Sequence, residues 1–144
     1  MLAQTRTMLD ECPIALVALT ASVRNETLVE CDRGDLPAVA AYAVSRGAKL
    51  ATMVGMDLTP MSRALAIEYV FSLPAYDEFL RVRASVPAND REYPSVTSAV
   101  PAAQWYEREA KDLLGITPID HPDPRRLVLH ERFPHGYHPL LKDV

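Results

Sequence analysis

The chain has 144 residues, of which 49% are hydrophobic, enough for one domain whose core needs no disulfide bonds. Its formal net charge of −4 argues against a protein whose affinity rests on nucleic-acid phosphates. The two cysteines, Cys12 and Cys31, stand alone, so they cannot supply an iron–sulfur cluster or a Cys-rich zinc site, and we expect both to be reduced.

No segment has the pattern of a membrane span or a secretion signal. The longest apolar stretch, PIALVALTA at residues 13–21, falls short of the roughly 20 residues that a spanning helix requires. The amino terminus, MLAQTRTMLDEC, lacks the basic start, long apolar region and cleavage site of a signal peptide. The sequence therefore predicts a soluble protein that stays inside the cell.

Five segments carry the apolar or alternating pattern of strands. They are residues 14–24, 27–31, 48–56, 64–73 and 80–86. The clearest is 64–73, in which Leu65, Ile67, Tyr69, Phe71 and Leu73 share one face. Tight turns at residues 24–26 and 74–75 separate neighbouring strands, and short turns favour antiparallel pairing.

Three helices are predicted, the first of them short and around residues 4–10. The second covers residues 35–46: Asp35 is suited to cap it, Pro37 suits its first turn, and Gly47 follows its end. The third begins near Val100-Pro101 and ends before Gly115. Both longer helices have an apolar stripe that can cover a sheet.

These elements predict an α+β fold in the order β-β-α-β-β-β-α. We expect a two-layer sandwich of a mainly antiparallel sheet covered by helices. Residues 1–116 would form the compact domain. Residues 117–144 hold five prolines, and only Leu127-Val128-Leu129 resembles an element, so we expect an extended, proline-rich C-terminal docking tail that lies on some other surface.

The third helix, WYEREAKDLLG, carries five charged side chains. Glu107 with Lys111 and Arg108 with Asp112 are four residues apart, a spacing worth about 0.2–0.5 kcal/mol per pair, which predicts a solvated face. Glu107 and Glu109 point about 200° apart around the axis, so they cannot flank one substrate. Trp105 is expected to be a core or interface anchor.

Nothing in the sequence predicts a catalytic or cofactor-binding residue. No nucleophile stands beside a histidine, and there is no glycine-rich phosphate loop. The four histidines, His121, His130, His135 and His138, lie in the tail, and His135-x-x-His138 could be imagined as zinc ligands. The intervening Pro134, Gly136 and Pro139 break any regular helix, so no metal site is predicted, and a small metal-dependent enzyme remains an alternative.

The C-terminal third carries an ordered series of motifs: EREAKDLLGI (residues 107–116), HPDPRRLVL (121–129) and HPLLKD (138–143), preceded by PSVTSAVPAAQW (94–105). This series resembles the family of the 30 kDa subunit of NADH-quinone oxidoreductase. That subunit lies in the peripheral arm of respiratory complex I. Related subunits occur in membrane-bound NiFe hydrogenase and formate hydrogenlyase complexes.

The resemblance implies a non-catalytic subunit without a redox centre that binds the large, hydrogenase-related subunit at the cytoplasmic face of the membrane. The signature and interface residues that it implies are Trp105, Glu107, Arg108, Glu109, Asp112, His121, Pro122, Asp123, Arg125, Arg126, His138, Pro139, Leu140, Lys142 and Asp143. Leu141 departs from the family's PLRKD, and Pro118 replaces an aromatic residue common in respiratory members. Because the chain stops after KD, we expect the split form of the subunit.

Two further expectations remain. Arg125 and Arg126 are multi-donor groups suited to carboxylates, so we expect one of them to bridge to the acids of the third helix and fix the direction of the tail. The leading hypothesis is a scaffolding subunit of a complex that passes electrons from NADH to quinone. The alternatives are the equivalent subunit of a hydrogenase-type complex, the metal-dependent enzyme, and a stand-alone binding module that lost its complex.

Overall fold

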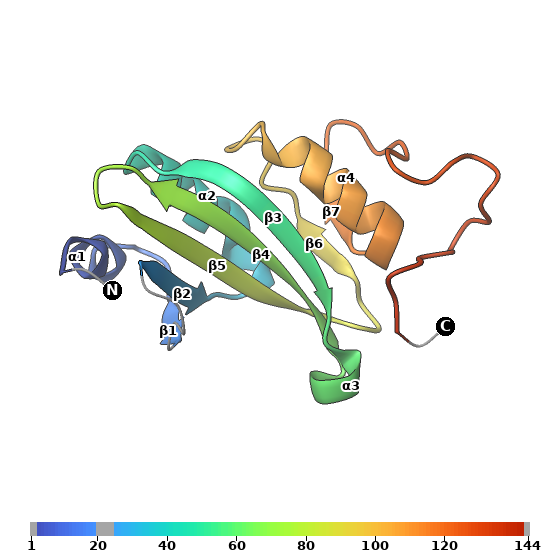
Figure 1. Ribbon diagram of the computed structural model, residues 1–144, viewed down its shortest axis with the longest axis horizontal. Helices are drawn as coiled ribbons and strands as arrows, with labels where there is room; N and C mark the ends of the chain where they lie inside the picture. Colours follow the sequence, from blue (N-terminus) through green and yellow to red (C-terminus); the bar gives the residue numbers. More distant parts are fainter. Residues whose placement is uncertain (1–2, 20–24, 143–144) are drawn as a thin grey trace.

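The computed structural model describes residues 3–19 and 25–142 of the chain. Figure 1 shows how the elements are arranged. The helices are α1 (Ala3–Asp10), α2 (Leu36–Ser45), α3 (Thr59–Ser62) and α4 (Ala103–Leu114), with a 3-10 turn at Arg33–Asp35. The strands are β1 (Val17–Leu19), β2 (Glu26–Glu30), β3 (Lys49–Asp57), β4 (Ala64–Leu73), β5 (Glu78–Pro87), β6 (Glu92–Pro94) and β7 (Thr117–Ile119).

Five strands form one sheet in the order β1-β2-β5-β4-β3, and β6 pairs with β7. The pairs β1–β2, β3–β4 and β4–β5 are antiparallel, which confirms the predicted α+β class with a mainly antiparallel sheet. Two parallel pairs, β2–β5 and β6–β7, were not predicted. Of the strand expected over residues 14–24, only Val17–Leu19 is a strand, and residues 20–24 lie outside the described residues.

The central strand β4 has the bounds that the sequence predicts, and it forms the middle of the core. Alternate side chains of a strand point to the same face, so β4 and β5 present one continuous apolar surface. The side chains on this surface are Leu65, Ile67, Tyr69, Phe71, Leu73, Leu80, Val82, Ala84 and Val86, each at most 2% exposed. Burial of this kind contributes about 1.5–3 kcal/mol for each large apolar side chain.

Helices α2 and α4 cover this apolar face, and α2 lies behind the sheet in Figure 1. Pro37 occupies the first turn of α2, where its missing N–H costs no hydrogen bond. After the helix, Gly47 adopts a φ of +86°, which turns the chain back into β3. Leu36, Val39, Ala40 and Ala43 supply the buried stripe of α2.

The opposite face of the sheet, toward the viewer in Figure 1, carries a group of ion pairs. Glu68 on β4 accepts hydrogen bonds from Arg81 at 2.5 Å and from Arg83 at 3.0 Å. Arg81 also reaches Glu26 on β2 at 3.0 Å. Glu68 is only 3% exposed, because the arginine side chains lie over it. The charges of these four side chains, two acids and two arginines, therefore balance within the group.

Residues 120–142, which we call the C-terminal segment, contain no helix or strand. The segment leaves β7 and passes around α4 before its last described residues, on the side of the molecule opposite α1 (Figure 1). Cys12 and Cys31 are free thiols. Burial, together with the neighbouring Asp35 and Asp32, raises the pKa of Cys31 to about 12, so its thiol is neutral at physiological pH.

Candidate functional site

The signature helix α4 packs closely against the sheet. It ends at Leu114, after which Gly115 takes a φ of +70° in the left-handed region that closes many helices. It packs directly over Gly55 of β3, where an added Cβ atom would lie 2.6 Å from Cδ1 of Leu114. The missing side chain at Gly55 therefore sets the spacing between α4 and the sheet.

The side chain of Glu107 points into the protein and is 0% exposed. Its Oε1 atom accepts hydrogen bonds from the Tyr69 hydroxyl and the Val96 amide, both at 2.8 Å. Its Oε2 atom accepts from the hydroxyls of Ser95 at 2.5 Å and Thr97 at 2.9 Å. Four donors thus offset the cost of burying this carboxylate, and they join β4, the turn after β6 and α4.

Tyr69 and Tyr93 are the aromatic neighbours of Glu107. Burial raises the pKa of Tyr69 well above its usual range, and the nearby Tyr93 and Glu107 add to this effect. Burial and Glu107 raise the pKa of Tyr93 in the same way. Both hydroxyls therefore stay protonated, and the Tyr69 hydroxyl acts as a permanent donor to the Glu107 carboxylate.

The predicted solvated face is wrong for three of the charges on α4. Glu107, Arg108 and Asp112 are 0%, 6% and 5% exposed, while Glu109 is exposed. Neither predicted pair with a spacing of four forms among the described contacts. Lys111 instead donates to a backbone carbonyl of the C-terminal segment at 2.8 Å. The helical spacing was correct, but these side chains have partners from elsewhere in the chain.

His121 fastens the start of the C-terminal segment to α4. Its imidazole is 2% exposed and lies 3.8 Å from Oε2 of Glu107. The amide of Asp123 donates to Nδ1 at 3.0 Å, so Nδ1 must present a lone pair. We therefore assign the proton to Nε2, which donates to the carbonyl of Gln104 at 3.1 Å.

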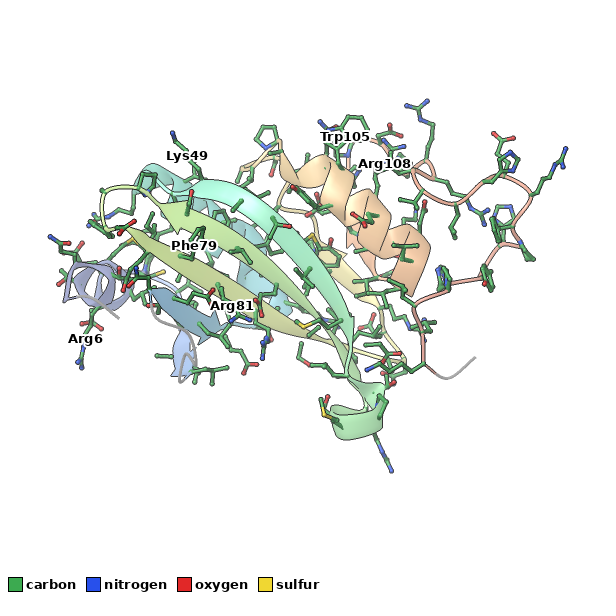
Figure 2. All side chains as sticks on the ribbon, in the orientation of Figure 1. Arg6, Lys49, Phe79, Arg81, Trp105 and Arg108 are labelled. Atoms are coloured by element: carbon green, nitrogen blue, oxygen red, sulfur yellow. The ribbon has the colours of Figure 1, made fainter. Side chains whose placement is uncertain are left out.

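Arg108 fixes the next part of the segment. Its guanidinium donates to the carbonyls of Arg125 and Arg126, each at 3.0 Å, and lies 3.1 Å from the Asp123 carboxylate. The same group lies over the Trp105 ring, 5.4 Å from the centroid. Figure 2 shows Trp105 and Arg108 together on α4. One buried cation thus holds both the backbone and a carboxylate of the segment.

Asp112 holds the triplet Leu127-Val128-Leu129, the stretch of the tail whose sequence resembles a secondary-structure element. Its Oδ2 atom accepts the amide N–H groups of Leu127 and Val128 at 2.8 Å and of Leu129 at 3.2 Å. These three amides need no strand partner, because one carboxylate satisfies them. The side chains of Leu127 and Val128 remain 39% and 51% exposed.

The expected bridge from Arg125 or Arg126 to the acids of the helix is wrong. Arg125 donates to Asp123 at 2.8 Å, which holds the pKa of Asp123 well below its usual range. Arg126 donates to three backbone carbonyls within residues 130–134, at 2.8–3.3 Å. The helix does hold this stretch, but its side chains bind the backbone of the segment.

The end of the segment returns to the carboxyl end of α4, where helix carbonyls lack helical partners. Nδ1 of His138 donates to the Asp112 carbonyl at 2.9 Å, and the Leu140 amide donates to the Leu113 carbonyl at 3.0 Å. The His138 ring also packs against Gly115, where an added Cβ would lie 2.8 Å from it. The segment thus completes the hydrogen bonding of the helix.

The last described residues reach β3. The amide of Lys142 donates to the Asp57 carboxylate at 2.7 Å. Hydrogen bonds from Thr59, and then from Lys142, lower the pKa of Asp57 below its usual range. Pro139 is exposed, and Asp143 lies outside the described residues.

Several large apolar side chains on α4 and the segment face solvent. Trp105 is 53% exposed, so the expected core role is wrong, while its interface role stays a prediction. The exposed apolar residues of the C-terminal segment are Leu127, Val128, Phe133, Tyr137 and Leu140. Phe133 and Tyr137 stack with ring centroids 5.5 Å apart.

The histidines are dispersed along the segment. Within residues 3–19 and 25–142, no group of three or more His, Cys, Asp or Glu side chains is arranged to hold a metal ion.

Among the described helices, none is long and apolar enough to cross a membrane.

Sequence reasoning missed the partners of the buried acids. It did not predict a role for Tyr69, because Tyr69 lies in a strand whose pattern indicates only burial, or for Asp57, which lies just beyond the strand predicted over residues 48–56. The signal that was present is the run Ser95-Val96-Thr97 between β6 and α4, where two hydroxyls flank an apolar residue. Such a run offers several donors to one buried acceptor.

Residues 29–144 match the family model described as "Respiratory-chain NADH dehydrogenase, 30 Kd subunit". Hydrogenase-4 component G and formate hydrogenlyase subunit 5 of Escherichia coli (strain K12) are each 42% identical to the chain, over 96 and 99 residues. The C subunit of the NADH-quinone oxidoreductase of Phenylobacterium zucineum (strain HLK1) is 40% identical over 96 residues. These alignments cover 66–68% of the chain, but only 17% of each Escherichia coli protein and 44% of the Phenylobacterium protein.

Among the solved structures that resemble the chain, two illustrate the likeness. The trypsin-resistant fragment (1–134) of Nqo5 has a TM-score of 0.65 at 28% identity, covering 83% of this chain and 96% of that one. The membrane-bound sulfane sulfur reductase, an archaeal respiratory membrane complex, has a chain with a TM-score of 0.79 at 15% identity, covering 97% and 82%. At that identity the second likeness shows the fold alone.

Proposed function

Because the chain belongs to the family of the 30 kDa subunit of respiratory-chain NADH dehydrogenase, we propose that it is a peripheral-arm subunit of an NADH-quinone oxidoreductase-type complex. It has no active site of its own and supports the large, hydrogenase-like subunit during electron transfer from NADH to quinone. Its place is the cytoplasmic face of the membrane, reached through the complex. Residues 1–116 act as the body and residues 117–144 as the docking part.

The observation that carries this proposal is the use of the charged residues of α4. Arg108, Lys111 and Asp112 all bond the backbone of the C-terminal segment, and the apolar side chains of Leu127 and Val128 face outward. Exposed apolar side chains on a backbone fixed in advance suit docking, because little further ordering is needed on association.

A second candidate is the equivalent subunit of a membrane-bound hydrogenase or formate hydrogenlyase complex. Identities of 42% to hydrogenase-4 component G and formate hydrogenlyase subunit 5 are as high as those to the relatives from NADH-quinone oxidoreductases. The proline at Pro118 also favours this group. Both candidates use the same docking role and differ in the electron donor and acceptor.

Affinity purification of the full-length chain from native membranes in mild detergent tests the proposal. We expect mass spectrometry to identify a large hydrogenase-like subunit in stoichiometric amount, and its absence would contradict the docking role. Loss of NADH-dependent quinone reduction after deletion of the gene supports the first candidate. Loss of formate-dependent hydrogen evolution supports the second.

A variant localises the docking surface. Val128→Asp places a charge on an exposed apolar position of the segment, and we expect recovery of the large subunit to fall at least about tenfold. Val44→Asp on α2 is the matched control, since Val44 is 39% exposed on another part of the molecule. Equal recovery with both variants would move the interface away from the segment.

A further inference from the structure

A pocket of about 350 Å³ lies between the carboxyl-terminal half of α4 and the C-terminal segment. Lys111 and Asp112 line it from the helix. The segment contributes the rest of the wall from two stretches, residues 124–129 and residues 135–138. None of the roles described above uses the interior of this pocket.

The charges of the pocket are unbalanced. Lys111 donates to the carbonyl of Pro124 at 2.8 Å, and Arg126 donates to three carbonyls within residues 130–134. Carbonyl oxygens satisfy hydrogen-bond donors, but they do not cancel a formal charge. Asp112 is the one carboxylate among the described lining residues, and its Oδ2 atom already accepts three amides.

Both cations keep donors for a further partner. In the described contacts, Arg126 donates through Nη1 and one Nη2 bond, so its Nε–H and the second Nη2–H remain. A guanidinium with two unused N–H donors can bind a carboxylate through charge-assisted hydrogen bonds. Lys111 uses one of its three N–H donors on Pro124. The group that would complete this ion-pair system is therefore an anion.

We propose that this pocket receives a carboxylate side chain of the partner protein. The inference rests on the proposed function, and it names the chemistry by which that partner is recognised. Lys111, Arg126 and Asp112 leave one net positive charge, which matches a monoanion better than a phosphate dianion. Pro124, Leu129 and Tyr137 in the lining offer apolar contact to the methylene groups of an Asp or Glu side chain.

Charge reversal at Lys111 provides the test in the assembled complex. We expect Lys111→Glu to lower recovery of the large subunit from membranes at least about tenfold, because a like charge would face the incoming carboxylate. Lys49→Glu is the matched control: it makes the same change in net charge at an exposed position at the start of β3, labelled in Figure 2. We expect the control to recover the large subunit as the unmodified chain does.

Two further measurements guard against loss of the local fold. Lys111→Gln keeps a donor for the Pro124 carbonyl but removes the charge, so we expect a smaller decrease with an unchanged circular dichroism spectrum. Arg126→Lys keeps the positive charge but loses the planar guanidinium with its several N–H donors, and we also expect an intermediate decrease in recovery of the large subunit. Raising the salt concentration should weaken association of the unmodified chain more than that of Lys111→Gln.

The outcomes separate the two proposals. If the unmodified chain recovers no large subunit, both the proposed function and this inference are overturned. If it does, and Lys111→Glu behaves as Lys49→Glu, only the inference is overturned. Titration of the free chain with inorganic phosphate and with acetate, followed through the amides of Leu127–Leu129, addresses the other source of an anion. Saturable binding of phosphate alone would overturn the assignment to a carboxylate.

Discussion

The five-stranded sheet and the C-terminal segment are held in place by different interactions. The sheet buries alternating apolar side chains, so its stability is spread over many contacts that have no preferred direction. Every described residue from 120 to 142 is exposed or half-buried as a whole, although the imidazole of His121 is itself only 2% exposed. The segment depends on directed hydrogen bonds from a few side chains of α4, chiefly Arg108 and Asp112.

Because of this difference, a single residue contributes a different share of the stability of each region. In the sheet, the free energy lost with one buried methyl group is a small part of the total that all the buried apolar side chains contribute. In the segment, one side chain can hold three or more backbone groups. Two carboxylates of α4, five positions apart, represent the two regions. Glu107 is hydrogen-bonded within the core, whereas Asp112 accepts hydrogen bonds from the segment.

Removing the buried carboxylate should have the largest effect. Glu107→Ala leaves three hydroxyls and the Val96 amide without their acceptor, and we expect the free energy of unfolding to fall by about 3 kcal/mol or more. Urea unfolding followed by circular dichroism measures this loss. Glu109→Ala, at an exposed position of the same helix, should change stability by no more than about 0.5 kcal/mol. Similar losses for both variants would show that Glu107 is not part of the core.

Removing the second carboxylate should release the segment alone. In Asp112→Ala, the amides of Leu127–Leu129 lose their common acceptor, a cost of about 1–3 kcal/mol, so their hydrogen exchange should accelerate about 5- to 150-fold. Amides of β4 should keep their protection. Glu131→Ala, an exposed change within the segment, serves as the control. Faster exchange in β4 as well would mean that the segment and the sheet unfold together.

Acid should produce the smallest effect, again on the segment. The pKa values of Asp123 and Asp57 are lowered by their hydrogen bonds, from Arg125 and from Thr59 with Lys142. Their contribution is fully present above the usual carboxyl pKa of about 3.9, and it is lost as the pH falls through the lower folded values. Solvent screening limits its size. We expect the Lys142 amide signal to stay constant from pH 7 to about 4 and then to shift; a shift centred above pH 4 would contradict this.

The sheet could be predicted from the sequence where buried and exposed residues alternate regularly along a strand. The alternation in β4 gives its bounds and its buried face, and Pro37 and Gly47 mark the ends of α2. The strands β6 and β7 have three residues each, too few to show a period, and Pro118 in β7 argues against a strand. The parallel pairing of β2 with β5 depends on distant partners, which local patterns do not indicate.

The site was less predictable, because a charged side chain on a helix has the same pattern whether its partner is solvent or a distant backbone. Spacing places Glu107 and Lys111 one helical turn apart, but the pair does not form among the described contacts, and spacing does not show that Tyr69 and Ser95 satisfy the carboxylate. Arg125 and Arg126 were expected as donors to the helix, whereas it is their carbonyls that accept from Arg108. Every residue has a backbone carbonyl, so the residue type does not indicate which carbonyl accepts a hydrogen bond.

The parallel pairing of β2 with β5 affects the order in which a growing chain can fold. Glu26 pairs with Phe79, and α2, β3 and β4 all lie between them in the sequence. During synthesis, β2 and α2 leave the ribosome before the strand that must lie between β2 and β4 exists. We therefore expect the hairpins β3–β4 and β4–β5 to form first, with β2 docking last across a long closed loop. Until then the apolar stripe of α2 is uncovered, which makes this interval the point at which the nascent chain is most prone to aggregate.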